Sequence, residues 1–441
     1  MSPALLDGRA DAVLFDGDRG ELTRGELRAA SAELAARLPA GRLIVNLCED
    51  RAGFAIVIAA AARRSTTVLL PPARDRGSLD RLLAAHPEAV VACDPGCTLL
   101  PPDPARVFEV RPAGGADDGL AIRVDAEAVA VTAFTSGSTG EPRAMRKTWH
   151  TLCAVAGMMR ARFWSERETV PGMIATVPPQ HMYGLECSVL MPLFCGWRSN
   201  RGMPFFPAEL AAQAGRQSGD WLLVTTPVHL RVLAAAGIQT SGLQRVISAT
   251  APLDDALAAA AEQGLGAPVM EIYGCTETGA IATRRTRQDR TWTLYDGIRI
   301  VADGDGGVVE SPHLPAAERL PDLLIVHSDT QFEFVGRPSD MIKVGGKRFS
   351  AAELERRIRE IDGVLDVAVV VPDAESGRES RPAALVVAPE LPDAELRTAI
   401  AGRVDSVLLP RPIRRVERIP RNATGKASRP ELLAMLDAAR R

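Results

Sequence analysis

The chain has 441 residues, a formal net charge of −3 and 46% hydrophobic residues. This length predicts two or three domains with a large core, and the charge argues against a nucleic-acid binder. The longest apolar run, residues 54–62, is too short to span a bilayer and predicts a buried helix. The first residues lack the apolar core of a signal peptide, and the seven cysteines are scattered. We therefore expect reduced thiols and a cytoplasmic protein without a membrane span.

Helices and short apolar strands alternate over much of the chain. Thr23 and Glu26 form a capping box that begins a helix, with Leu22 and Leu27 as its hydrophobic staple. This alternation predicts an α/β layered fold with a largely parallel sheet. The remaining strands are predicted at 43–47, 67–70, 89–92, 128–131, 173–177, 221–225, 245–248 and 269–273, and the remaining helices at 54–62, 79–85, 148–159, 209–217, 231–236 and 254–262.

The pattern changes towards the C-terminus. Residues 291–310 are rich in Thr, Trp and Gly and predict antiparallel hairpins. Pro338 and the small polar residues around it indicate a domain boundary, which divides the chain into residues 1–336 and 337–441. The second part is predicted to be a compact α+β domain. It has a capping box at 349–354, paired strands at 367–371 and 383–387, and helices at 395–407 and 430–436.

A hydroxyl- and glycine-rich segment follows the predicted strand at 128–131. It comprises Thr135, Ser136, Gly137, Ser138, Thr139, Gly140 and, at its end, Arg143. Glycine lets backbone N–H groups approach an anion, and the hydroxyls add donors, so the segment is typical of a phosphate-binding loop. It is not a Walker A loop, because the Lys-Ser/Thr pair is missing. The alternative is a flexible Ser/Gly surface loop.

Three further stretches carry polar groups suited to a nucleotide. The segment 273–277 places Tyr273, Gly274, Thr276 and Glu277 at the end of a predicted strand, where α/β sheets bind ligands. Asp329 offers a carboxylate for vicinal ribose hydroxyls, and residues 336–346 predict a hairpin. Each has a structural alternative: a turn with a packed tyrosine, an Asp that caps local backbone, and a surface hairpin.

Together, and in this order, these motifs resemble the adenylate-forming superfamily of acyl-CoA and aryl-CoA ligases, nonribosomal peptide adenylation domains and luciferase. The resemblance covers almost the whole chain, and Lys426 in Pro-Arg-Asn-Ala-Thr-Gly-Lys matches the family's catalytic lysine. It implies a large N-terminal α/β domain that binds ATP and the acid. It also implies a smaller mobile α+β lid domain that carries Lys426.

The resemblance also implies the chemistry and the residue roles. Such enzymes join a carboxylate to the α-phosphate of ATP, with Mg²⁺, and release pyrophosphate. Because the transition state gains negative charge, catalysis depends on positioning and positive charge. The implied roles are phosphate binding by Ser136, Gly137, Ser138, Thr139, Gly140 and Arg143; α-phosphate contact by Thr276; Mg²⁺ binding by Glu277 and Thr135; adenine contacts by Tyr273 and Glu271; further nucleotide contacts by Gly274, Thr250 and Ala251; ribose contacts by Asp329 and Arg337; and a bridging charge from Lys426.

Three departures from the family pattern stand out. Arg143 replaces the usual lysine after the phosphate loop, Ser339 occupies the hinge position, and the N-terminal region is short for the family. Arg keeps the charge but differs from Lys in geometry. The short N-terminal region favours the small stand-alone members that serve biosynthetic clusters.

Residues 178–186 resemble the family motif at the acyl pocket, in the form found in ligases of the aryl polyene and related polyketide pathways. The resemblance implies that His181, Met182, Tyr183 and Gly184 contact the substrate. His181 would gate the carboxylate site or, alternatively, serve as a core histidine. Met182 replaces the Asp that pairs with an amino-acid ammonium, so an α-amino acid is disfavoured. An aryl acid such as hydroxybenzoate or hydroxycinnamate is expected, with Tyr183 and His181 offering ring contacts or a hydrogen bond. A short- or medium-chain or 3-hydroxyacyl acid is the alternative.

The acceptor is expected to be a phosphopantetheine thiol, on coenzyme A or on an acyl carrier protein. Lys347 and Arg348 are candidates to meet either one, or are solvated surface charges. Two rival functions remain: a non-catalytic nucleotide-binding module, and a P-loop kinase or ATPase. Pyrophosphate release together with AMP would distinguish a ligase from both.

Overall fold

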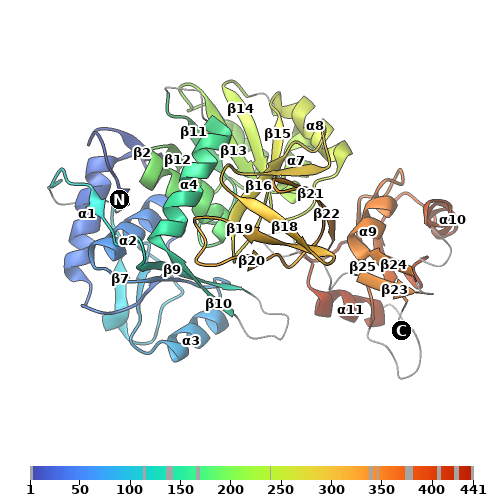
Figure 1. Ribbon diagram of the computed structural model, residues 1–441, viewed down its shortest axis with the longest axis horizontal. Helices are drawn as coiled ribbons and strands as arrows, with labels where there is room; N and C mark the ends of the chain where they lie inside the picture. Colours follow the sequence, from blue (N-terminus) through green and yellow to red (C-terminus); the bar gives the residue numbers. More distant parts are fainter. Residues whose placement is uncertain are drawn as a thin grey trace.

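A large unit and a smaller C-terminal unit make up the protein in its computed structural model (Figure 1). This mixed α/β architecture is the one predicted from sequence. The structure describes residues 3–112, 116–135, 143–164, 169–238, 240–336, 341–344, 347–372, 381–404, 409–421 and 427–438.

Six strands form the first sheet of the large unit, in the order β10-β9-β5-β4-β6-β7. All neighbours are parallel except β10, which runs antiparallel to β9 with Arg143 opposite Thr135. The strands are β4 (Ile44–Asn46), β5 (Val68–Leu70), β6 (Val90–Cys93), β7 (Val107–Glu109), β9 (Val129–Thr135) and β10 (Arg143–Thr148).

Eleven strands form the second sheet, in the order β21-β22-β17-β16-β15-β14-β13-β11-β12-β2-β3. From β2 to β15 the neighbours are parallel, and the two ends of the sheet are antiparallel. The strands are β2 (Val13–Asp16), β3 (Leu22–Thr23), β11 (Gly172–Ala175), β12 (Arg198–Asn200), β13 (Trp221–Thr225), β14 (Leu243–Ser248), β15 (Val269–Cys275), β16 (Gly279–Arg284), β17 (Thr291–Leu294), β21 (Leu323–Ser328) and β22 (Gln331–Gly336).

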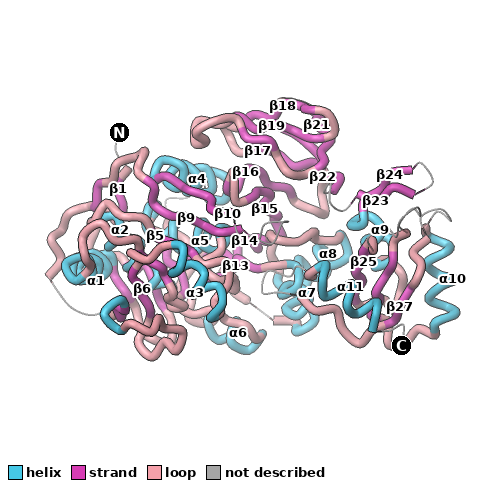
Figure 2. The backbone as a smooth tube through the Cα atoms, turned by 90° about the horizontal axis from the view of Figure 1, so that it is seen from below, coloured by secondary structure: helices cyan, strands magenta, loops and turns pink. Residues whose placement is uncertain are grey.

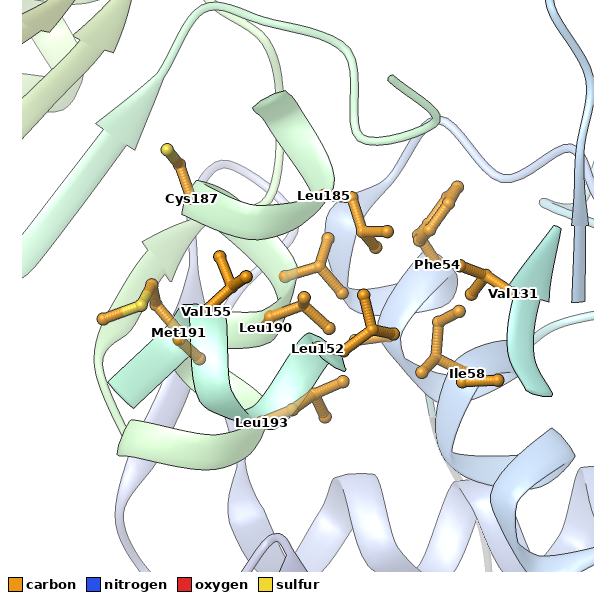
Figure 3. Packing of buried hydrophobic residues seen from close by; sticks show 14 of the residues in the cluster. Phe54, Ile58, Val131, Leu152, Val155, Leu185, Cys187, Leu190, Met191 and Leu193 are labelled. Carbon is orange, nitrogen blue, oxygen red and sulfur yellow. The ribbon is translucent and has the colours of Figure 1, made fainter. Parts of the chain in front are cut away.

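The main core lies between the two sheets and is filled by helices. Figure 3 shows Phe54 and Ile58 of α2 packing with Leu152 of α4 and Leu190 of the π-helix η2. Burying such side chains contributes about 1.5–3 kcal/mol each. The helices of this layer are α1 (Arg24–Arg37), α2 (Arg51–Arg63), α4 (Trp149–Trp164), α5 (Met182–Leu185) and η2 (Glu186–Cys195).

Two helix caps predicted from sequence are confirmed. The Thr23 hydroxyl accepts from Glu26 N at 3.3 Å, and the Glu26 carboxylate accepts from Thr23 N at 2.7 Å. The Thr148 hydroxyl accepts from Thr151 N at 3.2 Å at the start of α4. These caps fix where α1 and α4 begin.

Outer helices cover the far faces of both sheets. Helix α3 (Arg76–Ala85) packs its leucines on Val45, Leu69 and Val91 of the first sheet. Helices α6 (Pro207–Ala214), α7 (Pro227–Ala236) and α8 (Asp255–Leu265) share a core with Trp221, Leu223 and Val246 of the second sheet. Small elements complete the unit: β1 (Ala4–Leu5) with β8 (Ile122–Arg123), the 3-10 helix η1 (Pro104–Arg106), and the sheet β18 (Arg299–Asp303), β19 (Gly306–Glu310) and β20 (Glu318–Arg319).

The β18–β19 hairpin confirms the antiparallel character predicted for residues 291–310, and it lies beside β21 (Figure 2). In the C-terminal unit a three-stranded sheet separates α9 and α10 from α11. The predicted pairing of its first two strands is confirmed. The elements are β23 (Met341–Val344), β24 (Lys347–Ser350), α9 (Ala351–Arg359), β25 (Asp366–Val370), β26 (Ala383–Val387), α10 (Asp393–Arg403), β27 (Ile413–Arg415) and α11 (Arg429–Ala438). The side chains of the capping box predicted at 349–354 lie largely outside the described residues.

Two of the elements that were not predicted adjoin the candidate site motifs. Strand β10 stands between the phosphate-loop segment and α4, and the ten-residue π-helix η2 follows the acyl motif. A π-helix of this length is rare, and its Pro192 has no N–H to give to a helical bond. Among the described residues, no helix is both long and apolar enough to cross a membrane. All seven cysteines are free thiols, as predicted.

Candidate active site

The carboxyl ends of parallel strands gather at one edge of the second sheet. Strands β11, β13, β14 and β15 are neighbours in that order, so their ends meet there. The acyl motif lies on this edge: the Tyr183 hydroxyl is 2.9 Å from the Ile247 carbonyl at the end of β14. It is also 3.1 Å from the Thr225 carbonyl at the end of β13. The structure therefore brings the acyl motif to the edge at which β15 ends.

A tight turn of Thr276, Glu277 and Thr278 joins β15 to β16 at this edge. Thr276 and Glu277 are half-buried, so their side chains keep access to solvent. The Lys147 ammonium of β10 donates to the Glu277 carbonyl. Because β10 leaves the phosphate-loop segment, this bond joins two of the motifs recognised in the sequence.

The phosphate-loop residues Ser136, Gly137, Ser138, Thr139 and Gly140 lie outside the described residues, as do Arg337 and Lys426. The ends of the loop are described: Thr135 ends β9, and Arg143, which is exposed, begins β10 directly opposite. The loop thus connects two strands and does not run into a helix N-terminus. Any anion bound there would depend on donors from the loop itself, without the help of the α4 dipole.

Tyr273 is enclosed by an aromatic cluster. Its ring centroid lies 5.1 Å from Phe332 and 5.5 Å from Trp292, and only 8% of the residue is exposed. Its hydroxyl donates to Asp322 Oδ2 at 2.6 Å. Asp322 immediately precedes β21 and is 6% exposed. The carboxylate next to Tyr273 is therefore that of Asp322, which the sequence analysis did not single out.

Asp329, chosen from sequence as the ribose residue, lies at the opposite end of the same strand. The six residues of β21 separate it from Asp322, which amounts to about 20 Å. The Asp329 side chain is 61% exposed, 3.9 Å from Arg299. Since Tyr273 contacts Asp322, the geometry favours Asp322 for a nucleotide held by Tyr273. Asp329 lies in the turn between β21 and β22, which agrees with the structural alternative given for it from sequence.

Glu271 is also more deeply placed than an adenine contact requires. It is 2% exposed, and its Oε2 accepts from Arg284 Nε at 2.6 Å and from the Thr286 hydroxyl. Its Oε1 accepts from Leu253 N at 3.3 Å. Both oxygens therefore hold neighbouring chain segments, which favours a structural role. Gly274 lies further along the same strand and pairs with Ala280 of β16.

The loop after β14 contains a backbone outlier. Thr250 has a φ of +81°, and a β-branched residue is strained in that region. Such strain costs on the order of 1–3 kcal/mol and tends to persist at ligand sites. Thr250 and Ala251 are half-buried at the same edge as Tyr183. Their position is compatible with the nucleotide contacts expected from sequence.

Some residues of the acyl motif are accessible to a ligand, and others make contacts within the protein. His181 caps α5 without a side-chain bond to it, and both His181 and Met182 are half-buried. The Tyr183 hydroxyl has one proton, which the Thr225 and Ile247 carbonyls take, so it has none to donate to a ring hydroxyl of the substrate. At Gly184 a Cβ would lie 1.9 Å from the Pro178 carbonyl oxygen. The absence of a side chain at Gly184 therefore allows close packing on Pro178, and its contact with the substrate stays a prediction.

Comparison with protein-family models bears on these motifs. The model for AMP-binding enzymes matches residues 6–300, and that for the AMP-binding enzyme C-terminal domain matches residues 353–426. The chain belongs to the AMP-binding enzyme family. The first match lies in the large unit, and the second lies in the C-terminal unit and ends at Lys426.

Named members of the family are similar to the chain at low identity. A 3,4-dihydroxybenzoate–[aryl-carrier protein] ligase of Bacillus anthracis is 24% identical over 71% of this chain and 76% of its own length. A 4-coumarate–CoA ligase of Halorhodospira halophila is 29% identical over 67% of this chain and 74% of its own length. The o-succinylbenzoate coenzyme A synthetase of Bacillus subtilis, solved with ATP and a magnesium ion, superimposes with a TM-score of 0.81. At 16% identity it covers 96% of this chain and 97% of that one, and it shows the shared fold.

Proposed function

We propose that this chain is an AMP-forming acid–thiol ligase. It joins a carboxylic acid to the α-phosphate of ATP, releases pyrophosphate, and passes the acyl group to a phosphopantetheine thiol. The observation that carries the proposal is the Thr276–Glu277 turn, tied through Lys147 to the strand that leaves the phosphate loop. This arrangement occurs in a chain of the AMP-binding enzyme family.

The residues fit a nucleotide with its magnesium ion. Mg²⁺ commonly takes one or two carboxylates and completes its shell with phosphate oxygens and water. Glu277 offers one half-buried carboxylate next to the Thr276 hydroxyl, with Thr135 at the end of β9 as the second expected ligand. The described residues hold no group of three or more His, Cys, Asp or Glu that could bind a metal, and such a group is not needed here. When bound, Mg²⁺ would supply positive charge to the phosphates.

The protein's own groups would then position and neutralise the reactants. Tyr273 and Asp322 would hold the adenosine, and Thr276 would contact the α-phosphate. Ser136, Ser138 and Thr139 would hold the outer phosphates, and Lys426 would bridge the acid and the α-phosphate as a point charge. Because the reacting centre is anionic throughout, such positioning supplies most of the rate acceleration.

An aryl acid is the substrate that the site supports best. Met182 is half-buried and offers a thioether, which suits a ring and leaves an ammonium without a counter-charge. The aryl acids in the names of similar ligases agree with this choice. A fatty acid of short or medium length, or a 3-hydroxyacyl acid, is the second candidate.

The acceptor would be the phosphopantetheine thiol of coenzyme A or of a carrier protein, since similar ligases are named for either. We further propose that residues 1–336 form the adenylating core and residues 337–441 a lid that carries Lys426. The lid would turn between the two half-reactions and bring its β23–β24 hairpin to the site.

A substrate panel tests the proposal. Pyrophosphate release is measured with hydroxybenzoate, hydroxycinnamate, octanoate and tyrosine, and the thioester products are identified by mass spectrometry with coenzyme A and with a carrier protein. Turnover of an aryl acid with tyrosine inert is the expected result. Preference for octanoate would favour the second candidate, and preference for tyrosine would contradict the role given to Met182.

A further inference from the structure

Three buried ionisable side chains surround the turn that carries Thr276 and Glu277. Lys147 and Glu186 are each 3% exposed, and His313 is 2% exposed. They come from three different elements: β10, the start of η2, and the loop after β19. Lys and Glu are rarely buried to this degree, because an ionised group loses its hydration.

Each of the three binds a different peptide group of the turn. Lys147 donates to the Glu277 carbonyl, and His313 Nε2 donates to the Thr278 carbonyl at 3.0 Å. Glu186 Oε2 accepts from Ala280 N at 3.1 Å. The side chains therefore fix consecutive backbone groups on both sides of the Thr278 Cα.

The surroundings show that the fit is close. Gly279 has a φ of +72°, and a Cβ there would lie 2.6 Å from Glu186 Oε1. The Thr278 carbonyl can only accept, so His313 Nε2 carries a proton, and in the neutral ring Nδ1 then accepts from the Ser311 hydroxyl. Burial raises the pKa of Glu186 to about 7, against the attraction of Lys147. The backbone hydrogen bonds between β15 and β16 would be enough to hold an ordinary hairpin turn. The presence of three additional buried side chains at this turn therefore needs a separate explanation.

We propose that Lys147, Glu186 and His313 are positioning residues for the magnesium–ATP half-reaction. They hold the turn in one conformation, so that Thr276 and Glu277 are already oriented towards the phosphates and the metal before MgATP binds. Lys147 also makes the turn move with β10, and hence with the phosphate loop. The inference rests on the proposed function and extends it to residues that touch neither ATP nor the acid.

The cost of this arrangement supports a functional reason for it. A charged group in the interior is stabilising only when its partners compensate for lost water. Among the described residues Glu186 Oε1 finds no hydrogen-bond partner, so the compensation is incomplete. Sequences tend to depart from ordinary core composition where a site demands it.

The test separates positioning from simple stabilisation. Lys147→Met removes the donor at similar length, Glu186→Leu removes the acceptor, and Glu186→Gln keeps an amide oxygen for Ala280 N. Arg201→Met is the matched control, since Arg201 is a buried cation paired with Asp50 at 2.6 Å in another part of the unit. The affinity for ATP is measured by calorimetry without acid substrate, in Mg²⁺ and in EDTA. The KM for MgATP and the rate of thiol transfer from a supplied acyl-adenylate are then measured for each variant.

Lys147→Met and Glu186→Leu should weaken MgATP binding about tenfold, which corresponds to one lost hydrogen bond to a charged group. The loss should be smaller in EDTA, and thiol transfer should change less than about twofold, because that step needs neither triphosphate nor metal. Glu186→Gln should restore affinity to within about threefold of wild type. Arg201→Met should lower the melting temperature and leave ATP affinity unchanged.

Unchanged MgATP affinity in folded Lys147→Met, or equal losses in Glu186→Gln and Glu186→Leu, would overturn the inference. If Lys147→Met does not fold, the Glu186 pair tests the same claim from the other side of the turn. A wild type that binds MgATP but releases no pyrophosphate with any acid would overturn the proposed function alone.

Discussion

Glu186 should make the stability of the large unit depend on pH in a defined window. Burial raises the pKa of its carboxyl from 4.5 to about 7, although Lys147 and the Ala280 N–H act in the opposite direction. The ionisable groups beside it are Lys147, Cys187 and Tyr295. Burial raises the pKa of Cys187 and that of Tyr295 well above their usual values, and so away from neutrality. Burial lowers the pKa of Lys147, and Glu186 is the carboxyl of this group with a pKa near neutrality.

The sign follows from the direction of the shift. The folded-state pKa lies above the unfolded one, so the stability associated with the neutral carboxyl is fully present below pH 4.5. It is lost as the pH rises to about 7. A shift of about 2.5 units corresponds to about 3 kcal/mol. The group is 3% exposed, so solvent screening reduces this figure little.

Urea unfolding of wild type and Glu186→Gln at pH 4.5 and pH 7.5 measures the effect. The five tryptophans lie between Trp149 and Trp292, so their fluorescence reports on the large unit. Between the two pH values, wild type should lose about 3 kcal/mol of unfolding free energy relative to the variant. A difference that stays constant within about 0.5 kcal/mol would refute the buried, shifted carboxyl.

Four further outcomes are expected. Lys426→Ala should abolish acid-dependent pyrophosphate release and leave thiol transfer from a supplied acyl-adenylate intact; equal loss of both steps would contradict the two-conformation scheme. Glu277→Ala should slow the MgATP half-reaction on the order of a hundredfold or more, and near-normal turnover would remove it from the metal site. Asp322→Asn should raise the KM for ATP about tenfold while the control Asp329→Asn leaves it unchanged; the reverse order would restore Asp329 to the ribose. Met182→Asp should lower kcat/KM for hydroxycinnamate, because an unpaired carboxylate would lie in an apolar site, and an unchanged value would place Met182 outside the pocket.

Local signals made much of the fold predictable. The capping box at Thr23 and the apolar strands of the second sheet depend on residues that are near neighbours in sequence, and both are confirmed. Strand β10 was missed because its segment, Arg-Ala-Met-Arg-Lys-Thr, is polar and becomes a strand only by pairing with β9. The π-helix was missed because an apolar run around Pro192 has no helical period.

The site shows the same division between local and distant information. The Thr276–Glu277 motif was recognisable because its residues are consecutive. The sequence pattern does not distinguish Asp322 from Asp329, because each lies next to an end of β21: Asp322 precedes the strand and Asp329 follows it. Only the hydrogen bond from Tyr273 to Asp322 distinguishes them. Lys147 looks like a surface lysine in a polar segment, and only the folded chain shows that it is buried against Glu277.

The nucleotide products formed with hydroxycinnamate distinguish an AMP-forming ligase from a kinase or ATPase. Phosphorus NMR of a reaction with MgATP, the acid and a thiol acceptor identifies them in one experiment, with the acid omitted as the control. A ligase should form AMP and pyrophosphate in equal amounts and only when the acid is present. ADP and inorganic phosphate, or AMP formed at the same rate without acid, would contradict it.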